Sequence, residues 1–102
     1  MTTEALDTLP AGTLIYIPNE WAVDTWQFVA PVAGSIYYTL LHPPDDDGVI
    51  HNKRPVYMNA VDLKFATINP IDAWQNVQDG LIDRALFVAK MIASFKPIQK
   101  EP

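Results

Sequence analysis

The sequence contains no cysteine. This absence excludes disulfide scaffolds, thiolate metal sites and cysteine nucleophiles. Glycine is also scarce, with four scattered residues, so no glycine-rich loop is available to cradle a phosphate. No apolar run approaches the roughly 18 residues that a membrane-spanning helix needs, and residues 1–7 lack the basic region and apolar run of a signal peptide. We therefore expect a soluble protein, with the cytoplasm as its simplest location.

Basic residues are few, with seven Lys and Arg against twelve Asp and Glu, which gives a net charge of −5. Phosphate backbones and anionic lipids repel such a chain, so nucleic acids and membranes are disfavoured as partners. The composition is 49% apolar and 19% charged, which is typical of a globular protein. A length of 102 residues suits one domain, which we expect to span residues 1–102.

Short runs of β-branched and aromatic residues, separated by proline, glycine and polar residues, fill the first two-thirds of the chain. Such runs predict strands bounded by turns. Residues 1–11 have no such pattern and are interpreted as a loose lead-in. The predicted strands are residues 13–17, 25–29, 36–41, 55–58 and 64–68.

The order of these strands is similar to that of small SH3-like barrels. The resemblance covers residues 12–68 and depends on three features: the entry at Gly12, the irregular loop at residues 19–24, and the tight turn at residues 59–63. It implies a five-stranded antiparallel barrel. Because such barrels serve many unrelated binding functions, the resemblance does not indicate a function.

A helix start follows the last predicted strand. Asn69 suits the N-cap, Pro70 the first helical position and Asp72 the first turn. Apolar residues then recur every three or four positions, which predicts an amphipathic helix over about residues 70–95, within a C-terminal segment 70–96. Gly80 is the position at which this predicted helix is least stable and where it could bend or split. The fold class is therefore α+β, and the helical stripe comprises Ile71, Trp74, Val77, Leu81, Ala85, Val88, Ile92 and Phe95.

The apolar stripe of this helix can be buried in two ways. It packs across the barrel and completes one core, or it packs against the helix of a second copy to form a homodimer. Both remain open at this point. The candidate oligomer-interface residues are Leu81, Ala85, Val88, Ile92 and Phe95.

Exposed aromatic residues are the second candidate binding feature. Trp21 lies in a predicted loop between Glu20 and Asp24, which suits a basic or proline-containing peptide through stacking and charge. Adjacent strand residues face opposite sides of a sheet, so one of Tyr37 and Tyr38 must face outward. In the alternative interpretation, Trp21 folds back over the barrel end. The candidate partner-binding residues are Trp21, Tyr37, Glu20 and Asp24.

The loop at residues 42–51 carries the two histidines, His42 and His51, and three consecutive aspartates. Imidazole and carboxylate groups can ligate a metal ion, but the run does not match an EF-hand, and adjacent aspartates point in different directions. We favour a solvated acidic turn. We expect no metal, no cofactor and no catalytic residue.

These observations favour a non-catalytic protein-interaction module, such as an accessory subunit, an adaptor or a small inhibitor, that uses barrel loops and exposed aromatics. Small acidic domains of this kind are common among accessory proteins and among phage and viral proteins. A second hypothesis is a structural protein that homo-oligomerises through its helix. A third is a metal-dependent enzyme at the His42–His51 loop.

Overall fold

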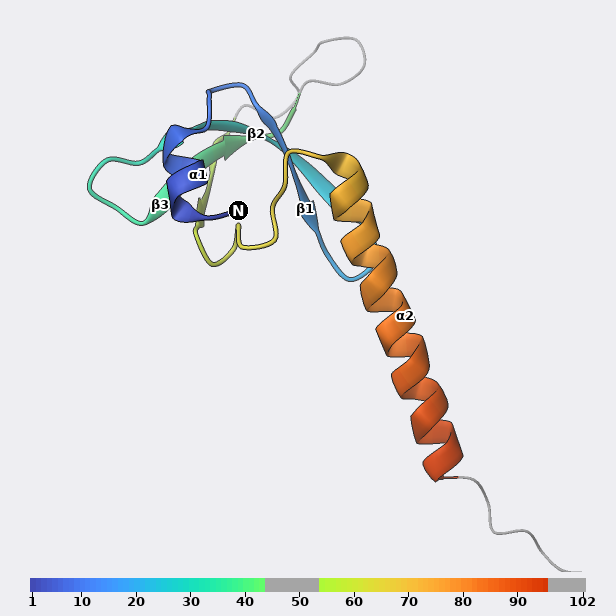
Figure 1. Ribbon diagram of the computed structural model, residues 1–102. Helices are drawn as coiled ribbons and strands as arrows, with labels where there is room; N and C mark the ends of the chain where they lie inside the picture. The colour runs from blue at the N-terminus through green and yellow to red at the C-terminus, as the bar shows by residue number, and fades with distance from the viewer. Residues whose placement is uncertain (44–53, 96–102) are drawn as a thin grey trace, which may run out of the picture.

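The computed structural model describes residues 1–43 and 54–95. It shows an α+β architecture in which an antiparallel sheet carries a short helix near the N-terminus and continues into a long C-terminal helix (Figure 1). The elements are α1 (Thr3–Thr8), β1 (Leu14–Pro18), β2 (Val23–Pro31), β3 (Tyr37–Leu41), β4 (Val56–Asn59) and α2 (Pro70–Ser94).

The sheet is a four-stranded meander in the order β1-β2-β3-β4, with each strand antiparallel to the next. The first four predicted strands are confirmed, with bounds that differ by one or two residues. The second strand is nine residues long and contains a register shift between Phe28 and Ala30. Such an irregularity bends a strand and increases its twist, which lets the sheet curl around its core.

The predicted fifth strand, residues 64–68, does not form. This segment makes one isolated bridge between Tyr16 and Thr67, with N–H···O distances of 2.8 and 3.0 Å. Two consecutive turns lie before this bridge, because the Leu63 amide donates to the Asn59 carbonyl and the Ala66 amide donates to the Leu63 carbonyl. These turns shorten the extended segment that could pair as a strand. Asn69 then begins the helix. Within the described part of the chain the sheet is therefore open, and the closed five-stranded barrel is not observed.

Part of the predicted lead-in is helical. Thr2 caps α1 by accepting a hydrogen bond from the Ala5 amide at 3.2 Å. Leu6 of this helix is fully buried, and Asp7 accepts a hydrogen bond of 2.9 Å from the Tyr38 hydroxyl. Six residues are too few to form a stable helix alone, so the docking of Leu6 is what fixes α1.

One hydrophobic core lies between α1, one face of the sheet and the turns that follow β4. Five of its seven buried residues have no exposed surface, and no residue of α2 belongs to it. The core therefore does not depend on the long helix for its packing. Its buried residues are Leu6, Ile15, Phe28, Tyr38, Leu40, Leu63 and Ala66.

The C-terminal helix is confirmed. The Asn69 side chain accepts a hydrogen bond of 2.9 Å from the Ile71 amide, Pro70 opens the first turn, and the helix runs without a break through Gly80. It packs on β1 and β2 through its first turns only and then projects away from the sheet (Figure 1). The radius of gyration is 19.6 Å, against about 13 Å for a compact chain of this length. In the described residues, α2 and α1 both lack the combination of length and hydropathy that crossing a bilayer requires.

Candidate interaction surface

The apolar stripe of α2 is largely exposed to solvent. The buried residues of α2 are Ala73 and, from the stripe, Val77, and both lie near the start of the helix. Farther along, Ile92 is 68% exposed and Phe95 is 75% exposed. Of the two alternatives left open by the sequence, packing of the stripe into one core with the sheet therefore does not apply to most of its length. Contiguous apolar surface on this scale is uncommon on monomers and commonly marks an interaction site.

The turn between β1 and β2 places a tryptophan beside this stripe. The Asn19 side-chain oxygen accepts hydrogen bonds from the amides of Trp21, at 2.8 Å, and Ala22, at 2.7 Å. The Asn19 amide donates to the Ala22 carbonyl at 2.8 Å, which closes the turn. Trp21 projects from this turn and is 70% exposed, so it does not fold back over the sheet.

Arg84 ties this turn to α2. Its guanidinium lies 4.6 Å from the centre of the Trp21 ring and donates a hydrogen bond to the Glu20 carbonyl. The Glu20 carboxylate lies 4.0 Å from the same guanidinium, but both side chains are substantially exposed, so this ion pair contributes at most about 1 kcal/mol. The main effect of these Arg84 contacts is to position Trp21, because they hold its indole beside the apolar side of the helix.

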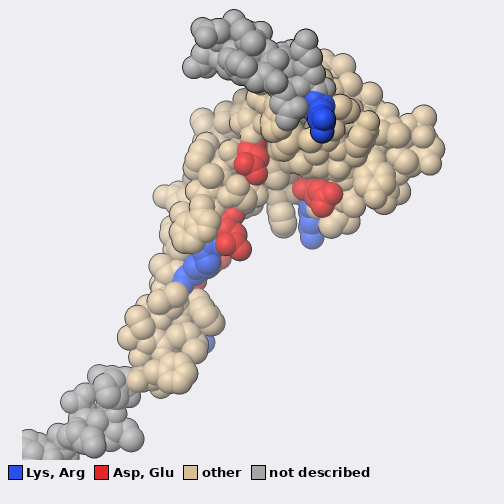
Figure 2. Space-filling model, turned by 180° about the vertical axis from the view of Figure 1, so that it is seen from behind, with Lys and Arg blue, Asp and Glu red and all other residues tan. Residues whose placement is uncertain are grey.

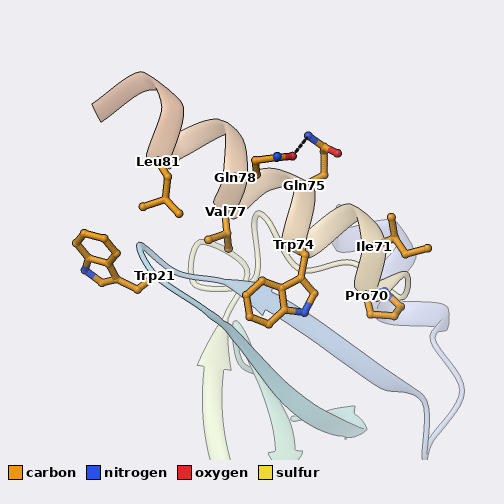
Figure 3. A pocket seen from close by; sticks show the side chains of 8 residues that line it. All are labelled: Trp21, Pro70, Ile71, Trp74, Gln75, Val77, Gln78 and Leu81. Carbon is orange, nitrogen blue, oxygen red and sulfur yellow. Dashed lines mark hydrogen bonds between the residues drawn. The ribbon is translucent and has the colours of Figure 1, made fainter. Parts of the chain in front are cut away.

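Two adjacent hollows follow the helix and share Trp21 and Leu81. The first has a volume of about 480 Å³ and lies over the first half of α2 (Figure 3). The second has a volume of about 540 Å³ and continues toward the free end. We call the two together the α2 groove. Its lining residues are Trp21, Pro70, Ile71, Trp74, Gln75, Val77, Gln78, Leu81, Arg84, Ala85, Val88, Ala89 and Ile92.

The groove has an apolar floor and a polar edge. Val77 and Leu81 point toward Trp21 and the β1–β2 turn, whereas Gln75 and Gln78 point away from that turn, at the edge of the apolar face, and are joined by a hydrogen bond of 2.9 Å (Figure 3). Gln75 also donates to Asp79 at 3.1 Å. On the face drawn in Figure 2, charged side chains are sparse over the half of α2 that projects away from the sheet, which we call its free half. An apolar centre with a polar rim is the usual organisation of a protein–protein interface.

The predicted partner-binding residues are divided between two places. Glu20 and Trp21 lie in the β1–β2 turn, and Asp24 lies at the start of β2, where its carboxylate accepts a hydrogen bond of 3.3 Å from the side-chain amide nitrogen of Asn19. Tyr37 is 44% exposed but begins β3, at the opposite end of β2. Trp21 and Tyr37 therefore do not form one surface. Their roles in binding stay predictions.

The sequence interpretation missed Arg84 and the contribution of Trp74 to the groove. Trp74 was recognised as part of the stripe, and its 52% exposure now places it on the interaction surface. Arg84 follows Val77 by seven positions, a spacing that places both on one side of a helix and is the signal in the sequence for a charged side chain beside the stripe. Its contact with Glu20 joins residues 64 positions apart, which the sequence does not reveal.

The other candidate site is only partly described. His42 follows β3, and its ring lies 4.5 Å from that of Trp26. His51 and the three aspartates lie outside the described residues. Residues 1–43 and 54–95 contain no group of three or more side chains placed to hold a metal ion.

No family model, curated protein or solved structure matches this chain. Its function is therefore inferred from the groove and the exposed helix alone.

Proposed function

We propose that this chain is a protein-interaction module that engages its partner along the α2 groove. The observation that carries the proposal is the exposed apolar face of a 25-residue helix whose free half makes no contribution to the core. Water contact with such a face is unfavourable, and burial against a partner removes it. Amphipathic helices are a common means of protein recognition.

The composition of the groove supports the same proposal. Tryptophan and arginine are the residue types that most often dominate binding energy in interfaces, and Trp21 and Arg84 lie in contact at its centre. Among the described residues that line the groove, Arg84 is the one charged side chain. A surface of this kind suits binding better than acid–base catalysis, which needs titratable groups placed at the reacting atoms.

A site-specific cross-linking experiment tests the proposal. A photoreactive p-benzoylphenylalanine is placed at Ile92, which lines the groove, or at Leu86, which does not. The two residues are matched, because they lie on the same helix and are 68% and 65% exposed. In cells, we expect protein cross-links from position 92 at several times the yield from position 86. Equal yields, or no protein cross-link from position 92, would contradict the proposal.

A further inference from the structure

The two halves of α2 differ in what lies beside them, and they cannot meet within one chain. The first half, with Trp21 of the β1–β2 turn, lines the first hollow of the groove. The second half projects bulky apolar side chains, including Ile92 and Phe95, where no other element of the described chain packs on it. The helix is continuous, so its free half cannot fold back into its own groove.

From this apolar hollow and this uncovered apolar half we infer that the occupant of the α2 groove is a second copy of this chain, with the two α2 helices packed antiparallel. The free half of each helix then fills the groove of the other, and both contacts are identical, as a two-fold axis requires. This inference rests on the proposed function and names its partner.

The spacing of the apolar residues favours a helix as the occupant. Successive members of the stripe are four, three, four and three positions apart, which is an average repeat of 3.5 residues. A repeat of 3.5 keeps one seam of a helix facing a second helix along its length. The same spacing extends back through Gln78 to Trp74. The seam residues are Trp74, Gln78, Leu81, Ala85, Val88, Ile92 and Phe95.

The middle of this seam suits close packing of two axes. Ala85 lies midway between Trp74 and Phe95, and Ala89 lies beside it in the groove. Small side chains let helices approach to the shorter end of the usual 8–10 Å range. Bulky residues lie toward both ends of the seam. A pair of helices crossing at Ala85 therefore places the ends of one seam against the ends of the other.

The charge distribution favours the antiparallel orientation. Before the crossing point at Ala85, α2 carries Asp72, Asp79, Asp83 and Arg84, a net charge of −2, whereas Lys90 is the one charged residue of α2 after it. Antiparallel packing brings the acidic half of each helix alongside the basic half of its partner, and it also aligns the helix dipoles favourably. It further leaves the two sheets at opposite ends, since each sheet packs on the first turns of its own helix (Figure 1).

The available area matches what a stable dimer needs. The six large apolar residues of the face are 52–75% exposed. At roughly 150–250 Å² for an aromatic side chain, the three aromatic members offer roughly 300–500 Å² per copy, and the three aliphatic members bring the total toward the roughly 800 Å² that one partner usually contributes, a sum that comes from all six residues. These residues are Trp21, Ile71, Trp74, Val88, Ile92 and Phe95.

Sedimentation of the purified full chain across the micromolar range tests the inference. We expect a dimer, and we expect Ile92→Asp to weaken self-association at least 100-fold. Circular dichroism should show that Ile92→Asp still unfolds cooperatively, since the core contains no α2 residue. The matched variant Leu86→Asp should remain dimeric. A monomeric wild type, or equal dissociation of both variants, would overturn the inference.

The absence of cysteine allows the orientation to be tested separately. Ala85→Cys lies at the crossing point and should form an intermolecular disulfide. Gln78→Cys is seven positions away, so in an antiparallel pair its two copies are about 21 Å apart along the axis, too far for a disulfide. Equally ready oxidation of Gln78→Cys would overturn the antiparallel arrangement. Cross-links from position 92 to a different protein, with a monomeric wild type, would reject the second copy while supporting the interaction module.

Discussion

The burial of Leu6 makes a strong prediction about α1. Leu6→Ala removes three carbon atoms from a side chain with no exposed surface, in a cluster with Ile15, Phe28 and Leu40. Buried Leu→Ala changes cost about 2–5 kcal/mol. Because α1 has six residues and can undock locally, we expect the lower part of this range, about 3 kcal/mol, and a decrease in Tm of roughly 10–20 °C.

Urea denaturation followed by far-ultraviolet circular dichroism measures this loss. The matched control is Ile36→Ala, which also removes three carbon atoms, but from a side chain that is 67% exposed. We expect the control to remain within about 0.5 kcal/mol of the wild type, as is usual for surface substitutions. A loss below 1 kcal/mol for Leu6→Ala, or equal losses in both variants, would refute the assignment of α1 to the core.

Three further predictions follow from single positions. Burial and the Asp7 carboxylate raise the pKa of Tyr38, so folding favours its protonated form; stability should fall as the pH rises above about 10, and less steeply in Tyr38→Phe. Denaturation midpoints between pH 8 and 11 measure this slope. Gly80→Ala, whose new Cβ would meet open space, should stabilise the middle of α2 by about 0.8 kcal/mol and raise its helicity on heating. Asn69→Ala should cost about 1 kcal/mol by removing the N-cap, measured by amide exchange in the first turn.

The features that local chemistry specifies were predictable from the sequence. The start of α2 is set by Asn69, Pro70 and Asp72, whose capping, φ restriction and charge act within one turn. Four strands follow from runs of β-branched and aromatic residues between turn formers. The turn after β4 was also predicted correctly, since Asn59 and Asp62 satisfy each other's backbone amides.

The features that depend on distant contacts were not predictable. α1 is held by the burial of Leu6 and by the Tyr38–Asp7 hydrogen bond, which spans 31 positions. The predicted fifth strand does not form because the segments on either side of it limit its length. Residues 64–68 alternate as a strand should, but the turns before them and the helix start after them leave room for a single bridge at Thr67.

The candidate site shows the same division. The stripe of α2 and the prominence of Trp21 follow from periodicity and from turn composition, and both were predicted. Their proximity was not, because it depends on the pairing of β1 with β2 and on the docking of the first turns of α2. The sequence also left open whether the stripe was core or surface. Helical periodicity shows that a face is apolar but does not show what covers it.

The energetics of α2 support the proposal that a partner covers its free half. An isolated helix shorter than about 12–15 residues is marginal in water, and the segment beyond Gly80 is of about this length and lacks tertiary support from the described chain. A helix that served only as a solvated extension would be more soluble with polar residues at Val88, Ile92 and Phe95, and the core would lose nothing by the change. The apolar seam stabilises this segment only when a second surface covers it. The folding of the free half and the filling of the groove are therefore coupled, and the helicity of residues 81–94 should depend on protein concentration if the partner is a second copy.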